Sequence, residues 1–127
     1  MNWFAEIGLV ALGGALGASS RYGVSKLIDF YFKSSLPIAT LIVNVSGCLL
    51  IGLLLGSGLD GKAHPVRIFF GIGFLGALTT FSSFGEETIV HAREGNWWIA
   101  GFNVLANLVI CLVAVVVGMF LGKRFFV

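Results

Sequence analysis

Charged residues are scarce in this chain. Of its 127 residues, 8 are Lys or Arg and 6 are Asp or Glu. The charged share is 11%, against roughly a quarter in an ordinary soluble domain. Hydrophobic residues make up 57%, and the mean hydropathy is +0.99. These values exclude a soluble globular domain, and the net charge of +2 provides no basic patch for a nucleic acid.

Residues that support enzyme chemistry are also few, since cysteine and histidine occur only twice each. Cys48 and Cys111 fall in apolar stretches, where we expect free thiols that behave as small hydrophobic groups. His64 stands in a polar loop without a second metal ligand nearby. No nucleophile is paired with a base, so we do not expect an enzyme.

Long apolar stretches are abundant, and each of them is long enough for a helix that crosses a bilayer. The four stretches are residues 4–26, 36–59, 66–91 and 96–122. The stretch 26–36 is expected to be a loop, and Pro37 suits the first turn of the second helix. The sequence therefore predicts an all-α integral membrane protein, with residues 1–127 forming one four-helix domain.

Small residues recur at helical spacing in three of these stretches. Glycines at such positions let two helices approach closely within a membrane. They are Gly13, Gly14 and Gly17 in the first stretch, Gly52 and Gly56 in the second, and Gly118 and Gly122 in the fourth. We expect these seams to be helix contacts.

The third stretch contains a segment that is poorly suited to a continuous helix, GIGFLGALTTFSSF at 71–84. Each interior glycine costs about 1 kcal/mol, and Thr and Ser side chains compete for backbone hydrogen bonds. We expect a break near 77–81. Non-helical backbone at membrane depth is tolerated only inside protein or beside a water-filled path, so the break indicates an ion or substrate site. The GxGxxG spacing at 71–76 lacks the strand context of a nucleotide site.

Polar residues inside the other spans allow two readings. Asn44 shares a helix face with Thr40, and its amide either bonds another helix or donates to an anion. Arg21 either extends to the interface or is a buried arginine at a dimer centre or an anion pathway. Asn103 and Asn107, with Cys111, form a polar stripe that we expect to face another helix.

Aromatic and hydroxyl residues follow the expected break. Phe81 and Phe84 share a helix face, either as ordinary lipid-facing or core side chains or as ring edges that approach a small anion. Ser82 and Ser83 present hydroxyls beside them. Glu87, after Glu86, marks either a solvated helix end or a vestibule.

Positive charges are balanced between the two sides of the predicted bundle. Lys62, Arg67, Lys123 and Arg124 fall on the side of the termini, and Arg21, Lys26, Lys33 and Arg93 on the other. This balance gives no preferred orientation. Insertion in both orientations, and an antiparallel homodimer with its two-fold axis in the membrane plane, are the natural expectation.

Three motifs together resemble the Fluc (CrcB) fluoride channel family, and the resemblance covers all four spans. They are GGALGASSR at 13–21, TLIVNVSG at 40–47 and GFLGALTTFSSF at 73–84. The resemblance implies a dual-topology antiparallel homodimer in the inner membrane, with a broken third helix and two narrow pores. It also implies passive export of cytoplasmic fluoride, which gives fluoride resistance.

The resemblance also implies roles for individual residues. Pore and polar-track positions would be Phe81, Phe84, Asn44, Ser82, Ser83 and, more weakly, Thr40. A structural sodium ion at the dimer centre would be held by the backbone carbonyls of Gly76 and Thr79. Arg21 and Glu87 match family positions, the latter without an assigned role. The fourth span departs from the family pattern, because Phe102, Asn103 and Asn107 replace the usual Ser, Thr or Tyr.

Two other functions are compatible with a small four-helix protein. A small multidrug transporter needs a carboxylate within the membrane, whereas Glu6 lies near a span end. A membrane scaffold would use the glycines and asparagines for packing alone, which leaves the break unexplained.

Overall fold

The computed structural model describes residues 2–33, 36–59, 61 and 64–127. In these residues the chain is helical and has no strand. The elements are α1 (Trp3–Tyr31), α2 (Ile38–Gly56), η1 (Arg67–Leu75), α3 (Gly76–Leu78), α4 (Phe81–Arg93) and α5 (Trp97–Phe126). Since η1, α3 and α4 together form one apolar segment, the described part of the chain has four candidate membrane spans, as predicted.

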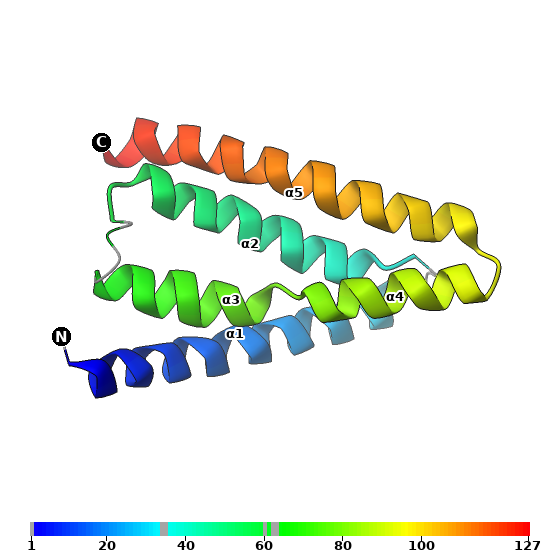
Figure 1. The fold of residues 1–127 in the computed structure, drawn as a ribbon, viewed down its shortest axis with the longest axis horizontal. Helices are drawn as coiled ribbons and strands as arrows, with labels where there is room; N and C mark the ends of the chain where they lie inside the picture. The colour runs from blue at the N-terminus through cyan, green and yellow to red at the C-terminus, as the bar shows by residue number, and fades with distance from the viewer. Residues whose placement is uncertain (1, 34–35, 60, 62–63) are drawn as a thin grey trace.

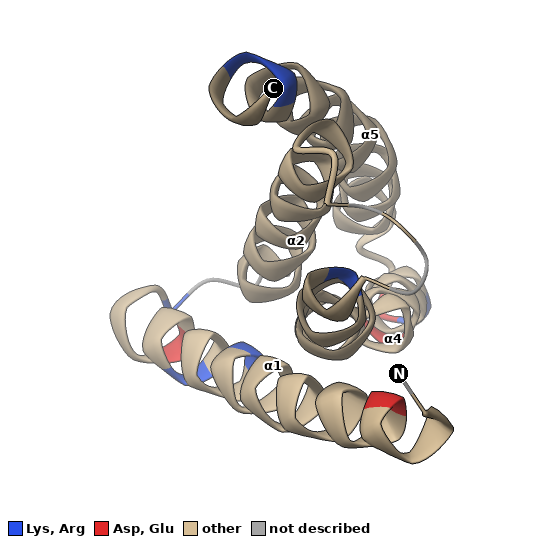
Figure 2. Cartoon of the chain, turned by 90° about the vertical axis from the view of Figure 1, so that its left-hand side faces the viewer, with Lys and Arg blue, Asp and Glu red and all other residues tan. Residues whose placement is uncertain are grey.

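The helices run roughly along one long axis, with α2 beside α5 and the third span beside α1 (Figure 1). Both termini, the end of α2 and the start of η1 lie at one end of the bundle (Figure 1). An end-on view shows that α1 crosses the other helices obliquely and that charged residues lie mainly near helix ends (Figure 2). Asp60 and Lys62, which the sequence places in the second loop, lie outside the described residues.

The first helix is longer than predicted. The loop expected at 26–36 was wrong over 26–31, because α1 continues to Tyr31. No glycine or proline occurs between Gly23 and Pro37 to end it earlier. At Phe32 the backbone becomes extended, and the Phe32 N–H donates to the Ile28 carbonyl at 2.7 Å.

The predicted glycine seams are contacts between backbones. A Cβ atom added to Gly52 would meet the Val115 carbonyl oxygen, and one added to Gly118 would meet that of Leu49. Gly13 and Gly17 contact the backbone of η1 and α3 in the same way. The seams of the second and fourth spans therefore face each other, so α2 and α5 approach more closely than side chains would permit.

The third span departs from a regular α-helix twice. Its first part, η1, is a π-helix, which the sequence did not indicate. Its regular structure then stops at Thr79 and Thr80, where the backbone is extended with ψ of 153° and 117°. This interruption lies within the interval 77–81 predicted from the glycine, threonine and serine content.

Candidate functional site

Asn44 of α2 supplies hydrogen bonds to the interrupted backbone. The Thr80 N–H donates to Asn44 Oδ1 at 2.8 Å, and Asn44 Nδ2 donates to the Thr80 carbonyl at 3.2 Å. A side-chain amide carries the same donor and acceptor as a peptide group. Asn44 thus replaces the helical bond that the Thr80 N–H would make and adds a second donor to the Thr80 carbonyl, which as N-cap already accepts the first bond of α4. The interhelical role considered for Asn44 is confirmed.

The interruption also removes the helical donors of the backbone carbonyls that precede it, and those of Gly76 and Thr79 are among them. In a continuous helix the Gly76 carbonyl would accept from the Thr80 N–H, and the Thr79 carbonyl from the Ser83 N–H. The Thr80 N–H instead donates to Asn44, and the Ser83 N–H donates to Thr80 Oγ1 at 3.1 Å. Both carbonyls have lost their helical donors.

Gly76 and Thr79 line one cavity of about 180 Å³, together with Gly47 and other residues. A Cβ on Gly47 would meet the Thr79 methyl group, so α2 lies directly against the interruption. Neutral carbonyl oxygens are hard ligands that suit a hard cation. The donor set therefore fits the sodium ion implied by the sequence resemblance.

Thr80 is the N-cap of α4, a role that the sequence reasoning missed. Its hydroxyl accepts from the Ser83 N–H, donates to Ser83 Oγ at 3.1 Å and lies 3.2 Å from Ser82 Oγ. Threonine directly before a helical run is a common N-cap signal, which would have identified it. The cap holds the hydroxyls of Ser82 and Ser83 together at the start of α4.

Arg21 of α1 binds the other side of the interruption. Its Nε donates to the Ala77 carbonyl at 3.1 Å. Carbonyls at the C-terminal end of a helix lack intrahelical partners and carry partial negative charge. Arg21 therefore stabilises the end of α3, and the roles considered for it from the sequence stay predictions.

Phe81 and Phe84 lie together, as their spacing predicts. Their ring centroids are 5.2 Å apart, and Phe81 is 80% exposed. Both rings line a groove of about 250 Å³ together with Asn44, Cys48, Thr79, Thr80, Asn107, Leu108 and Cys111. Cys48 and Cys111 are free thiols, as expected. The groove is thus lined both by two aromatic rings and by Asn44, whose amide is hydrogen-bonded to the interrupted backbone.

A polar cavity lies beside the groove that Phe81 and Phe84 line. Its volume is about 210 Å³, and its lining includes Arg21, Thr40, Thr80 and Ser83. Thr40 Oγ1 donates to Glu87 Oε1 at 2.6 Å, and Glu87 Oε2 is buried without a partner in the described structure. Because Thr80 lines both cavities, the candidate residues form two adjoining groups.

The asparagine stripe of the fourth span faces other helices, as predicted. Asn103 is only 1% exposed, and its Nδ2 donates to Thr88 Oγ1 of α4 at 2.9 Å. Asn107 accepts from Asn44 Nδ2 at 2.9 Å. These amides connect α5 to both α2 and α4.

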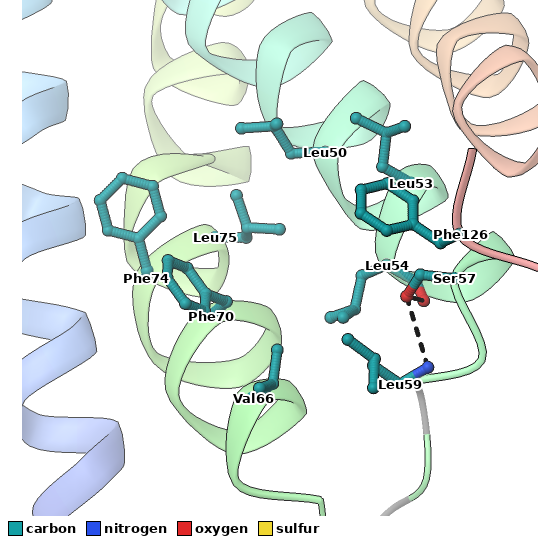
Figure 3. Close-up of a pocket in the computed structure, with 10 residues that line it drawn as sticks. All are labelled: Leu50, Leu53, Leu54, Ser57, Leu59, Val66, Phe70, Phe74, Leu75 and Phe126. Atoms are coloured by element: carbon teal, nitrogen blue, oxygen red, sulfur yellow. Dashed lines mark hydrogen bonds between the residues drawn. The ribbon is translucent and has the colours of Figure 1, made fainter. Parts of the chain in front are cut away.

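A larger cavity, of about 300 Å³, lies at the opposite end of α2 (Figure 3). Leucine, valine and phenylalanine side chains form its wall, with Ser57 as the polar exception. The Ser57 hydroxyl donates to the Leu54 carbonyl at 2.8 Å and accepts from the Leu59 N–H at 3.3 Å. Because the Ser57 hydroxyl is already engaged in these two bonds and the rest of the wall is apolar, this cavity offers an ion no favourable contact.

Comparison with known proteins identifies the family. The family described as CrcB-like protein, Camphor Resistance (CrcB), matches residues 8–119. The chain belongs to this family. The CrcB match includes the glycines of α1, Asn44, the interruption and the asparagine stripe.

Curated relatives are similar over nearly their whole length. A protein of Photobacterium profundum is 42% identical over 93% of this chain and 94% of its own. One of Shewanella baltica is 46% identical over 87% and 90%, and one of Aliivibrio salmonicida is 40% identical over 97% and 99%. Each of these CrcB relatives is named "Fluoride-specific ion channel FluC".

Proposed function

We propose that this protein is a fluoride-selective, passive ion channel of the cell inner membrane, which exports cytoplasmic fluoride and so gives fluoride resistance. The observation that carries the proposal is the groove in which Phe81, Phe84 and Asn44 meet beside the interrupted helix. The names of the relatives, all fluoride-specific channels, supply the ion.

The chemistry of this groove suits a small, strongly hydrated anion. The edge of a phenyl ring is electropositive, so Phe81 and Phe84 attract an anion without holding it tightly. Asn44 lies beside them, and an arriving fluoride displaces the longer of its two donated bonds, the 3.2 Å bond to Thr80. Ser82 and Ser83 supply hydroxyl donors on the adjoining side, and Thr40 is the weaker candidate because its hydroxyl donates to Glu87. Several weak donors in a narrow path replace the water of hydration.

Passive transport accords with the placement of carboxylates. Glu6 lies in the first turn of α1, and Glu87 is bonded to Thr40 near the far end of the bundle. Hydrogen fluoride enters as a neutral molecule and ionises inside, so membrane voltage drives the anion outward without a coupled proton. A proton-coupled exchanger would need a titratable group at the centre of the path.

The interruption is proposed to lie near the middle of the membrane. Within Arg67–Arg93, residues 67–78 precede Thr79 and residues 81–93 follow Thr80, so the two halves are nearly equal in length. Non-helical backbone at that depth requires protein or water around it. Its bonds to Asn44 of α2 and, on the other side, to Arg21 of α1 satisfy part of this requirement.

Single chains that insert in both membrane orientations would pair as an antiparallel homodimer, and this pairing would complete the site. The strongly exposed Phe81 leaves one side of the groove open for a second chain to cover. Gly76 and Thr79 would hold a structural sodium ion at the two-fold axis, since two carbonyls from each chain give four oxygens. The ion would tie the two interrupted helices together.

Fluoride efflux from liposomes tests the proposal. Purified protein is reconstituted with internal potassium fluoride or chloride, and valinomycin sets the voltage while ion-selective electrodes record release. We expect rapid fluoride release without chloride release. Phe81→Ile and Phe84→Ile remove the ring edges and are expected to slow fluoride by about tenfold or more.

Phe70→Ile is the matched control, because Phe70 lines the apolar cavity instead. It is expected to conduct like the unmodified chain. Absence of fluoride release from a monodisperse preparation would overturn the channel function, and proton-coupled cation uptake would be measured next. Normal flux in both groove variants would overturn the assigned path.

A further inference from the structure

Three asparagines form one continuous chain of hydrogen bonds across the candidate site. Asn44 Nδ2 donates to Asn107 Oδ1 at 2.9 Å, and Asn107 Nδ2 donates to Asn103 Oδ1 at 2.9 Å. Asn103 Nδ2 donates to Thr88 Oγ1 at 2.9 Å, and Thr88 Oγ1 donates to the Phe84 carbonyl at 2.7 Å. Every bond runs in the same direction, from α2 through α5 to α4.

The amide hydrogens of this chain are all engaged. Besides the bonds above, Asn44 Nδ2 donates to the Thr80 carbonyl, Asn107 Nδ2 to the Asn103 carbonyl and Asn103 Nδ2 to the Phe84 carbonyl. Each Nδ2 therefore has two acceptors for its two hydrogens. Aligned amides in an apolar setting polarise one another, which favours one orientation of all three side chains.

Both ends of the chain are fixed to the segment that carries the phenylalanines. At one end Asn44 bonds both backbone groups of Thr80, the N-cap of α4. At the other end the chain reaches the backbone carbonyl of Phe84. The asparagines thus span the first turn of α4, in which Phe81 and Phe84 lie.

We propose that Asn107 is a positioning residue for ion conduction, and this inference rests on the proposed fluoride path. Asn107 is the link between Asn44 and Asn103, so it orients the Asn44 amide and sets its place relative to Phe84. Asn107 is 7% exposed, and all of its amide hydrogens are used within the chain. It acts on the ion through Asn44.

Substitutions at Asn107 separate its hydrogen bonds to Asn44 and Asn103 from its packing in α5. Asn107→Leu has the same branching, with a larger volume, and neither accepts nor donates. Asn107→Ser is polar but too short to bridge Asn44 and Asn103. Asn107→Asp keeps the length of the side chain and an acceptor for the Asn44 amide. Leu105→Ala, on the exposed side of α5, is the control.

The fluoride efflux rate per active protein and the fluoride-to-chloride ratio are measured for each variant that is monodisperse. Asn107→Leu and Asn107→Ser are expected to lose about tenfold in rate, as for a lost hydrogen bond to a site group, and to admit more chloride. Asn107→Asp is expected to restore the rate to within about threefold. In the double variant with Asn44→Ala, Asn107→Leu should add little.

The side-chain amide signals of Asn44 give a test that does not depend on transport. Their nitrogen and proton shifts are expected to move in Asn107→Ser and to stay near the original values in Leu105→Ala. If the unmodified chain passes no fluoride, the proposed function fails. If it conducts and Asn107→Ser conducts equally with unmoved Asn44 signals, or if the effects of the Asn44 and Asn107 substitutions multiply, the positioning role alone is overturned.

Discussion

The two halves of the α2–α5 contact are built from different chemistry. Toward the C-terminal ends, Gly52 and Gly118 bring the backbones together, and Gly56 and Gly122 repeat the arrangement one turn on. Toward the N-terminal ends, Asn44 and Asn107 join the helices through a side-chain hydrogen bond. One pair of helices thus has a dry half and a polar half.

The difference follows from what each half must accommodate. The glycine half borders continuous helix, where backbone groups are already paired and close packing suffices for association. The asparagine half borders the interruption at Thr79 and Thr80, where backbone groups need new partners within an apolar medium. Polar side chains therefore occur where the neighbouring helix is broken.

Filling the glycine half should have the largest effect. Gly118→Leu would place its Cβ against the Leu49 carbonyl and 2.9 Å from the Leu53 N atom, and backbone on that side cannot move without separating the helices. We expect a loss of about 3 kcal/mol or more in the free energy of unfolding. Size-exclusion chromatography and thermal unfolding in detergent measure it.

Gly101→Leu is the control, since a Cβ there meets nothing within 4 Å. A Gly118→Leu protein that unfolds at the same temperature as the unmodified chain would contradict the close contact.

Removing the Asn44 amide from the polar half should have the next largest effect, and this effect should be mainly on transport. Asn44→Ala deletes three hydrogen bonds and leaves the Thr80 N–H and the Asn107 Oδ1 without the partners that they have in the structure. Buried unsatisfied groups cost about 1–3 kcal/mol each, so we expect fluoride efflux to fall by about 100-fold.

Ser46→Ala, at an exposed position of the same helix, should conduct normally. Efflux from Asn44→Ala within twofold of that control would show that the break needs no support from α2.

Trimming the far end of the asparagine chain should have the smallest effect. Thr88→Val removes a hydroxyl that accepts from Asn103 Nδ2, but that amide still donates to the Phe84 carbonyl at 3.3 Å. We expect less than about 1 kcal/mol in stability and less than about threefold in efflux. Thr88→Ser, which restores the hydroxyl, should match the unmodified chain, and a tenfold loss in Thr88→Val would mean that the polar half is more tightly coupled than its bonds indicate.

Features that depend on local composition could be predicted from the sequence. The four apolar segments, the glycine seams and the interruption near Thr79 all follow from residue types at close spacing. The neighbouring rings of Phe81 and Phe84 follow from helical periodicity after the break. The roles proposed for these rings, and for the sodium ligands, stay predictions.

Features that depend on distant pairs could not be predicted. Nothing in the spacing of Gly52 and Gly118 says that these two seams face one another, since helix register is set in three dimensions. The same holds for Asn44 with Thr80, and for Arg21 with Ala77. The π-helix of η1 has no distinct signal in the spacing of its residues.

The pair of hydrogen bonds between Asn44 and Thr80 has a consequence for how the protein is assembled. α2 is synthesised before the third span, so the amide that receives Thr80 is already in the membrane when Thr80 arrives. Until the two segments dock, the Thr80 N–H has no partner from α2. We therefore expect the interruption, which local composition favours, to take its final geometry only when the third span packs against α2.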